Sequence, residues 1–396
     1  MLRKKTILVL TLTVIYILFY TKYIYIFFVN DTGNGFFGDW YYFVNAIKCE
    51  KISESCGVFN YGQILLYLPF NKNLDFLYYK ILPFFFIIIF VFLIFKIIKL
   101  NNKKDYFLIL ILLFNPSTLL LLERANFDLL IFITIILICY SKSFWINYFL
   151  VGFSFLSKYY PISFFMNFFI ENKLRTNLKS TILFSSCLIF SFTFIFFHIS
   201  EFKEFIENSG YSKAGYHYLF SIKAIAKVIK YLFDTNYIIL LVFFYSLYIF
   251  LSIKLFFYFQ KKKLFNFFDL YKTEDKLFIL GTNTLIVCFL FFSNWYYREV
   301  FLILSLPLLI RLKNETKLNI INFIIIFIIL RYLFLFIYSY LHLQETHYQI
   351  DGVRFFYNSF LLIVTIKGIA DFLLMSFLTS FLIFYNFEIL KKIKIY

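Results

Sequence analysis

The stretch Phe84-Phe85-Phe86-Ile87-Ile88-Ile89-Phe90-Val91 is apolar throughout. A strand of a membrane barrel would alternate apolar and polar side chains, because its two faces meet lipid and lumen in turn. A helix satisfies its own backbone hydrogen bonds within lipid. Apolar runs near or above about 18 residues, the length of a helical span, recur from one end of the chain to the other. The pattern therefore predicts an all-α polytopic membrane protein.

The composition agrees with this class. Of the 396 residues, 62% are hydrophobic and 25% aromatic, which excludes the two soluble domains that length alone would allow. The formal net charge of +17 would suit nucleic acid. The lysines, however, lie in short clusters between apolar runs, as the positive-inside rule expects, so no nucleic-acid partner is expected.

The basic clusters set the expected topology, with all of them in the cytoplasm. They are Arg3-Lys4-Lys5, Lys96/Lys99/Lys103/Lys104, Lys142, Lys173/Arg175/Lys179, Lys261-Lys262-Lys263, Arg311/Lys313/Lys317 and Lys391/Lys392/Lys394. The expected spans are then about 7–28, 76–98, 106–122, 128–141, 145–157, 160–171, 181–199, 237–257, 277–292, 299–310, 318–340 and 368–388. This gives about twelve transmembrane helices, both termini in the cytoplasm, and a single integral membrane domain over residues 1–396.

Three long segments fall on the exoplasmic side in this topology, at 29–75, 200–236 and 341–367. Residues 36–47 and 355–366 within them are rich in aromatics, and we expect them to lie as interfacial helices.

Asp39 lies in the first of these segments, within the polar island Gly38-Asp39-Trp40-Tyr41-Tyr42 that follows the first apolar span. An acid held against the membrane by aromatic residues is a candidate general base. The alternative is a solvated acid beside an aromatic belt.

Two short exoplasmic turns carry further charge. The turn Glu123-Arg124-Ala125-Asn126-Phe127-Asp128 places four polar side chains between two apolar helices. Lys158 lies in the turn before Pro161, where an exoplasmic cation runs against the positive-inside trend and suggests a bound anion. Ordinary loop chemistry for the first turn and a snorkelling lysine in the second are the competing interpretations.

A third turn ends in Tyr297 and Arg298. Arginine suits bidentate phosphate contact, and an intramembrane ion pair between Arg298 and Glu299 is the structural alternative. Arg331 lies deep in the expected eleventh span and needs a partner or a cavity.

The 200–236 segment carries His217 among lysines and tyrosines, a mixture that suits an anionic lipid head group or a solvated surface. Cys49 and Cys56 share the first exoplasmic segment. They form a disulfide in one interpretation and stay unpaired in the other. No Cys/His spacing resembles a zinc site, no acid lies at ligand spacing beside Asp39, and no phosphate-binding glycine loop is present, so no metal or cofactor is expected.

Together these residues resemble glycosyltransferase family 87, within the GT-C superfamily of polytopic membrane enzymes. The resemblance rests on Gly38-Asp39, on Cys56 through Asn60-Tyr61-Gly62, and on Asn115-Pro116-Ser117-Thr118 leading to the Glu123–Asp128 turn. It continues in Lys158-Tyr159-Tyr160-Pro161 and in Tyr297-Arg298 before an apolar helix with Pro307. Relatives have proline at the position of Gly62, glycine at that of Ala125 and an acid near that of Tyr296.

The resemblance implies a GT-C-like fold and transfer of one sugar, with inversion, from a polyprenyl-phosphate donor to an exoplasmic glycolipid or glycan acceptor. It makes Asp39 the general base. Lys158, Arg298 and Arg124 would hold the carrier phosphate, with Tyr297, Asn126 and His217 among the substrate-binding residues. Glu123 and Asp128 would orient Arg124 or bind sugar hydroxyls. It also implies a bacterial cytoplasmic membrane, with the active site on the exoplasmic face.

Two other classes of membrane protein compete with this prediction. A transporter or lipid flippase would place its polar residues near the bilayer midplane and would often show two similar halves. A polysaccharide polymerase usually carries one large, late loop as its reaction site. Here the charges collect at one face, no half-repeat is evident, and the acid lies in the first loop, which favours the single-sugar transferase.

Overall fold

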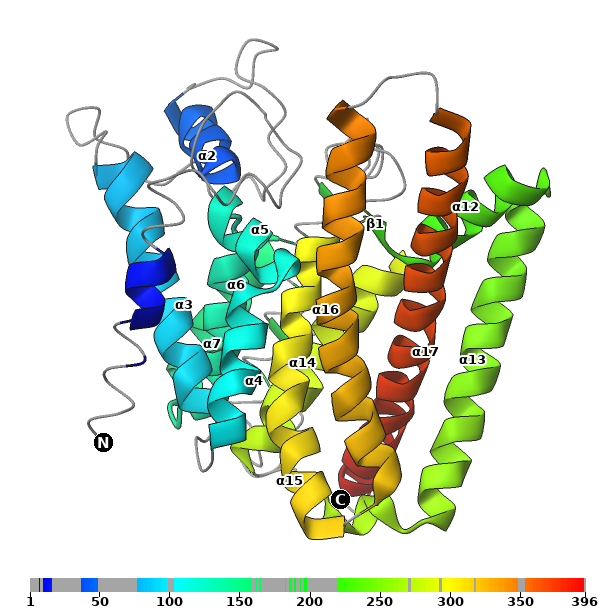
Figure 1. Cartoon of the computed structure of the whole chain (residues 1–396). Coiled ribbons are helices and arrows are strands. Elements are labelled where there is room, and N and C mark those ends of the chain that lie inside the picture. Colours follow the sequence, from blue (N-terminus) through cyan, green and yellow to red (C-terminus); the bar gives the residue numbers. More distant parts are fainter. Residues whose placement is uncertain are drawn as a thin grey trace.

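The structure, a computed structural model, describes residues 7, 10–15, 37–48, 77–98, 103–158, 219–269, 272–291, 294–316, 318–347 and 353–394, with isolated positions between 161 and 197. Over these ranges it is helical, apart from one short antiparallel pair of strands, β1 (Leu219–Phe220) and β2 (Asn294–Trp295). The long helices stand side by side as a bundle (Figure 1).

The helices of the main ranges include a π-helical turn, η5, and two 3-10 helices, η8 and η9. In chain order they are α2 (Gly38–Lys48), η5 (Leu77–Ile81), α3 (Leu82–Ile97), α4 (Lys103–Phe114), α5 (Pro116–Arg124), α6 (Asp128–Tyr140), α7 (Phe144–Ser157), α12 (Ile222–Phe233), α13 (Tyr237–Lys261), η8 (Leu264–Phe267), α14 (Thr273–Phe291), η9 (Tyr296–Ser305), α15 (Leu306–Thr316), α16 (Asn319–His347) and α17 (Val353–Lys394).

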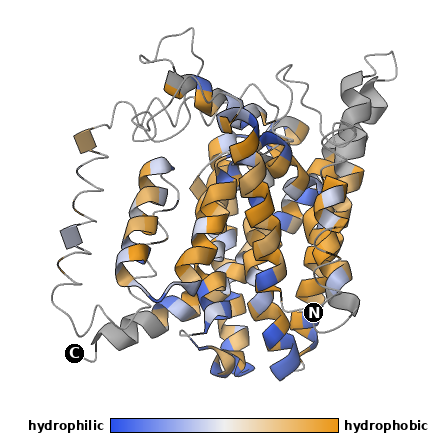
Figure 2. Ribbon diagram, turned by 90° about the vertical axis from the view of Figure 1, so that its left-hand side faces the viewer, coloured by the Kyte–Doolittle hydropathy of each residue, from blue (hydrophilic) through white to orange (hydrophobic). Residues whose placement is uncertain are grey.

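Several of these helices are long and apolar enough to cross a membrane, which makes this an integral membrane protein. Within the described ranges there are four of them, covering Leu77–Ile97, Tyr237–Lys261, Asn319–Ile337 and Leu362–Phe387. A bent pair, Tyr106–Phe114 with Pro116–Arg124, makes a fifth if it counts as one span. Apolar residues predominate in the middle of the helices, and polar residues gather at their ends (Figure 2). The twelve expected spans are thus not shown.

Several expected boundaries differ from those in the structure. The span expected at 299–310 is the 3-10 helix η9 followed by α15, and α6 and α7 are short helices of 13 and 14 residues. The exoplasmic segment expected at 341–367 is mostly helical, because α16 continues to His347 and α17 begins at Val353. The interfacial helix expected at 355–366 is therefore the first part of α17, whereas the one expected at 36–47 corresponds to the separate helix α2.

The bend between α4 and α5 is built by Asn115. The two helices meet at 55°, and Pro116 begins α5, where its missing N–H is not needed. The Asn115 side chain accepts a hydrogen bond from the Thr118 N–H at 3.0 Å and donates one to the Leu112 carbonyl at 2.7 Å. Asn115 thus caps α5 and satisfies a carbonyl at the end of α4, so it pairs backbone groups on both sides of this buried break.

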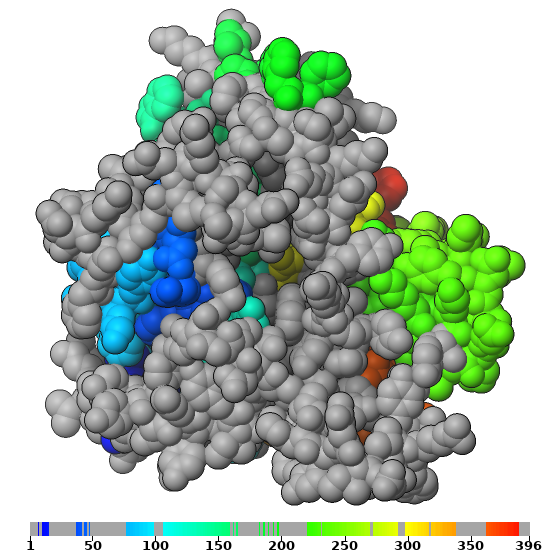
Figure 3. All heavy atoms as spheres, turned by 90° about the horizontal axis from the view of Figure 1, so that it is seen from above, coloured from blue at the N-terminus to red at the C-terminus, as the bar shows by residue number. Residues whose placement is uncertain are grey.

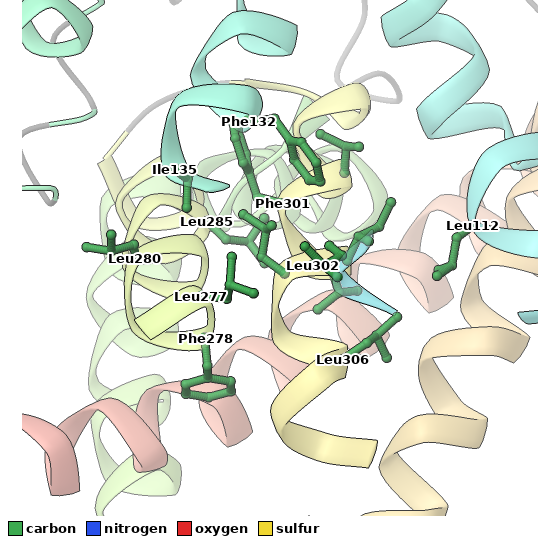
Figure 4. Packing of buried hydrophobic residues seen from close by; sticks show 14 of the residues in the cluster. Leu112, Phe132, Ile135, Leu277, Phe278, Leu280, Leu285, Phe301, Leu302 and Leu306 are labelled. Carbon is green, nitrogen blue, oxygen red and sulfur yellow. The ribbon is translucent and has the colours of Figure 1, made fainter. Parts of the chain in front are cut away.

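One part of the apolar core lies between α4, α6, α14, η9 and α15 (Figure 4). Phe132 of α6 packs on Phe301 of η9 with ring centroids 6.2 Å apart. Gly281 of α14 lies so close to η9 that an added Cβ would be 2.5 Å from the Leu304 Cβ. Glycine is therefore required for α14 and η9 to pack at this distance.

The two ends of the bundle differ in the elements that they carry. Helix α2, strand β1 and helix α12 lie at one end, and the lysine-rich ends of α13 and α15 lie at the other (Figure 1). Helix α13 packs loosely against the other helices. Only 11% of its most apolar 18-residue stretch is buried, so most of its surface is available to lipid.

Candidate functional site

Asp39 is positioned by the way in which α2 begins. Phe37 has a positive φ of 62°, and its N–H donates to the Glu123 carbonyl at 2.8 Å, which ties the start of α2 to the end of α5. The buried Trp40 indole donates to the Tyr78 carbonyl at 2.8 Å. These two contacts direct the first turn of α2, which contains Asp39, toward the turn after α5.

Arg124 and Asn126 both bind the Asp39 carboxylate. The Arg124 Nε and Nη2 lie 2.8 Å and 2.7 Å from Asp39 Oδ1. The Asn126 side-chain amide donates to Asp39 Oδ2 at 2.5 Å. The turn presents both side chains because Ala125, between them, takes the left-handed conformation that ends α5, with a φ of 44°.

Asn126 links this pair to a second ion pair. Its Oδ1 accepts hydrogen bonds from the Asp128 N–H at 2.9 Å and from Lys158 Nζ at 2.8 Å. The Lys158 ammonium also binds Asp128 Oδ1, and Arg298 Nε lies 2.9 Å from Asp128 Oδ2. Asp128 is fully buried and holds one cation on each oxygen.

These six residues form one continuous set of polar contacts, which we name the Asp39 cluster. It consists of Asp39, Arg124, Asn126, Asp128, Lys158 and Arg298. The six residues carry three cations and two carboxylates, and Glu123 is not among them. The cluster therefore has an excess of positive charge, which favours a further anion.

Viewed from the end that carries α2, cyan-green and yellow atoms from the middle of the chain are visible between the blue of α2 and the green of α12 and α13 (Figure 3).

The members of the Asp39 cluster lie at different depths. The side chains of Asp39, Arg124 and Arg298 are 13%, 15% and 18% exposed, whereas that of Lys158 is 6% exposed. Burial lowers the pKa of the Lys158 ammonium, and the adjacent Asp128 carboxylate acts in the opposite direction. Lys158 is therefore an inner residue that holds Asn126 and Asp128, and the two arginines are closer to solvent.

Glu123 lies beside the Asp39 cluster, and its expected role of orienting Arg124 or binding sugar hydroxyls stays a prediction. Its side chain is buried, and its Oε2 has no hydrogen-bond partner within the described ranges. Asp128, for which the same role was expected, binds Lys158 and Arg298. Arg124 binds Asp39.

The remaining candidate residues lie outside what the structure describes. They are His217, Cys49, Cys56 and the side chain of Tyr297. Among the described residues, no group of three or more His, Cys, Asp or Glu side chains is placed to hold a metal ion.

A second cluster of charges lies deeper in the bundle, and most of it was not predicted. Arg331 of α16 pairs with Glu299 of η9 and with Asp371 of α17, with Nη2 2.6 Å from Glu299 Oε2 and Nε 2.5 Å from Asp371 Oδ1. Lys367 of α17 lies 2.9 Å from Glu299 Oε1 and 2.8 Å from Asp371 Oδ2. We name these four residues the Glu299 tetrad. All four are buried.

The tetrad supplies the partners that Arg331 needed. The alternative in which Arg298 pairs with Glu299 is not what the structure shows, because Arg298 binds Asp128 and Glu299 binds Arg331 and Lys367. Lys367 and Asp371 were not singled out from the sequence: Lys367 lies just before the span expected at 368–388, and Asp371 lies inside it. The available signal was their spacing of four residues within an apolar helix, which places opposite charges on one face.

No family model, curated protein or solved structure matches this chain.

Proposed function

We propose that this protein is a membrane glycosyltransferase that moves one sugar from a polyprenyl-phosphate donor to an exoplasmic glycolipid or glycan acceptor. The observation that carries the proposal is the Asp39 cluster at one end of the bundle. In it the partly exposed Asp39 carboxylate binds Arg124, and the partly exposed Arg298 joins the same set of contacts through the buried Asp128. A lipid-phosphate sugar needs cations for its leaving group and a base for its acceptor, and the cluster offers both.

Asp39 has the hydrogen-bonding capacity that a general base needs. A carboxylate has about four lone-pair sites. Within the described ranges three donors approach Asp39, two from Arg124 at Oδ1 and one from Asn126 at Oδ2. One acceptor site remains at Oδ2, where an acceptor hydroxyl would donate. Arg124 and Asn126 then hold the carboxylate in one orientation.

The arginines suit the leaving group. In the proposed reaction the acceptor oxygen attacks the anomeric carbon from the face opposite the phosphate, and its proton passes to Asp39. The bond between that carbon and the phosphate oxygen breaks, and polyprenyl phosphate leaves with the electron pair. Arg124 and Arg298 would stabilise the developing phosphate charge, and Lys158 would hold Asp128 and Asn126 behind them.

A transporter or flippase remains the second candidate, and the Glu299 tetrad is the observation that favours it. Buried ionisable side chains in helices of a membrane protein often mark a substrate or proton pathway. The tetrad pairs two acids with two cations, however, so its charges already compensate one another.

The test uses the purified protein in proteoliposomes without an energy source. Individual polyprenyl-phosphate sugars, labelled in the sugar, are supplied with a lipid extract as acceptor. Transfer of label to a new glycolipid or glycan, absent with Asp39→Asn, is the expected result. Movement of the intact donor across the bilayer without a new product would overturn the proposal in favour of transport.

A further inference from the structure

Helix η9 connects the two charge clusters through consecutive residues. Arg298 belongs to the Asp39 cluster and Glu299 to the Glu299 tetrad. In a 3-10 helix, with about three residues per turn, neighbouring side chains point about 120° apart. A rotation or shift of η9 that moved Glu299 would therefore move Arg298 as well.

Two sets of contacts hold η9 in place at Glu299. The Glu299 carboxylate binds Arg331 and Lys367, and the Tyr332 hydroxyl donates to the Glu299 carbonyl at 3.1 Å. These partners come from α16 and α17, whereas Asp128, the partner of Arg298, belongs to α6. Helix η9 is thus anchored to α16 and α17 through Glu299, and its neighbour Arg298 reaches α6.

Stability alone gives little reason for four buried charges at this place. Removing charges from water is costly, and apolar replacements of similar volume are often as stable or more so. Directional ion pairs do, however, define one orientation of the helices that carry them. A short 3-10 helix has weaker internal hydrogen bonds than an α-helix, so it depends more on such external contacts.

We propose that Glu299 is a positioning residue for the Asp39 cluster: its ion pairs with Arg331 and Lys367 hold η9 so that Arg298 reaches Asp128. The role of the cluster in sugar transfer rests on the proposed function, but the placement of Arg298 does not. The experiment therefore reads the environment of Arg298 directly.

The chain offers a matched pair of double variants. Glu299→Met with Lys367→Met leaves Arg331 paired with Asp371, and Asp371→Leu with Lys367→Met leaves Arg331 paired with Glu299. Each variant removes one acid and one lysine and keeps the remaining charges balanced. Only the first variant removes every ion pair that Glu299 makes with α16 and α17.

The measurement is the rate at which phenylglyoxal modifies the Arg298 guanidinium in the detergent-purified full-length protein, read by peptide mass spectrometry. Arg311, at the other end of the bundle, is the internal reference for general loosening. Asp128→Asn, which removes the partner directly, gives the upper limit. We expect Arg298 to react roughly fivefold faster in the Glu299 variant, equivalent to about 1 kcal/mol, and at the wild-type rate in the Asp371 variant.

Equal rates at Arg298 in the two double variants would overturn the proposal, since the tetrad would then be structural only. If the Glu299 variant does not fold, Glu299→Asp replaces it, with Asp371→Glu as its control. Glu299→Asp keeps the charge and shortens the tether by one methylene, so it should raise the Arg298 rate, and an unchanged rate would again refute the proposal.

Activity gives a second and separate result. If the protein transfers sugar, the Glu299 variant should lower kcat/KM for the sugar donor, as Arg298→Gln should, and the Asp371 variant should not. If the wild-type protein transfers nothing, the proposed function fails while the Arg298 rates still decide the positioning role.

Discussion

Arg298 and Glu299 are consecutive residues that bind different partners: Arg298 Nε lies 2.9 Å from Asp128 Oδ2, and Glu299 Oε1 lies 2.9 Å from Lys367 Nζ. One peptide bond thus separates the partly exposed candidate site from a fully buried ion cluster. In one of the two interpretations of the local sequence, the two side chains would pair with each other. The packing of η9 between α5, α14 and α16 instead gives each a partner from a distant helix.

Asp39→Asn should strongly reduce the proposed sugar transfer while leaving the fold intact. Asparagine keeps the shape of the side chain but cannot accept the proton, and general-base catalysis is worth about 10²–10⁴-fold. We expect turnover to fall by at least about 100-fold, with sugar-donor binding largely kept. Asp39→Glu should recover little, since a misplacement of about 1 Å can cost about 10²-fold.

The control for this change is Asp234→Asn, which alters an exposed acid at the C-cap of α12, at the same end of the bundle. Its turnover should equal that of the wild type. Near-normal transfer by Asp39→Asn would remove Asp39 as the base and make Glu123 and Asp128 the next carboxylates to test.

Arg298→Gln should lower kcat/KM for the polyprenyl-phosphate sugar by about 10²-fold, because it removes a charged donor from the leaving phosphate. Arg311→Gln is the matched control. Arg311 is also half-buried and pairs with a buried acid, with Nη2 2.6 Å from Asp275 Oδ2, but it lies at the opposite end of the bundle. The Arg311→Gln variant should be less stable than the wild type and should have an unchanged kcat/KM. Equal kinetic losses in both variants would indicate a structural role for Arg298.

The sidedness of the bundle can be tested by cysteine labelling in intact cells. The positive-inside rule places the lysine-rich end in the cytoplasm. Thr235→Cys, between α12 and α13 at the α2 end, should react with an impermeant maleimide from outside, and Asn314→Cys, near the end of α15, should react only after permeabilisation. Both positions are exposed. The reverse pattern would invert the topology and place the Asp39 cluster on the cytoplasmic side.

Gly281→Ala should destabilise the protein by about 1–3 kcal/mol, the range typical of overpacking. The added Cβ would lie 2.5 Å from the Leu304 Cβ, so α14 and η9 would have to separate. Gly152→Ala, in α7, is the control because an added Cβ there meets nothing within 4 Å. Thermal unfolding in detergent should show a loss for the first variant and none for the second. Equal melting temperatures would show that η9 can yield to a methyl group.

Much of the architecture is predictable from local sequence. Long apolar runs specify helices within lipid whatever their neighbours, and basic clusters mark one end of the bundle, because both effects depend on hydropathy and charge at each position. The polar turns around Asp39, Asn126 and Lys158 were recognisable for the same reason, since each interrupts apolar sequence. Their convergence in one cluster is in keeping with their expected side of the membrane.

Other features depend on packing and could not be predicted. Hydropathy does not distinguish a helix that faces lipid, such as α13, from one surrounded by protein, such as α6. Nor does it reveal that residues 296–305 form a 3-10 helix pressed against Gly281.

The sequence by itself determined the class of the protein, its helices and the polar positions at one end, because these follow from properties of neighbouring residues. The choice of partner for each buried charge was decided only by tertiary structure. Arg298 and Asp128 are separated by 170 residues, and Lys367 and Glu299 by 68. An ion pair acts over a few ångströms in low dielectric, so its partner is set by which helices pack together and not by spacing along the chain.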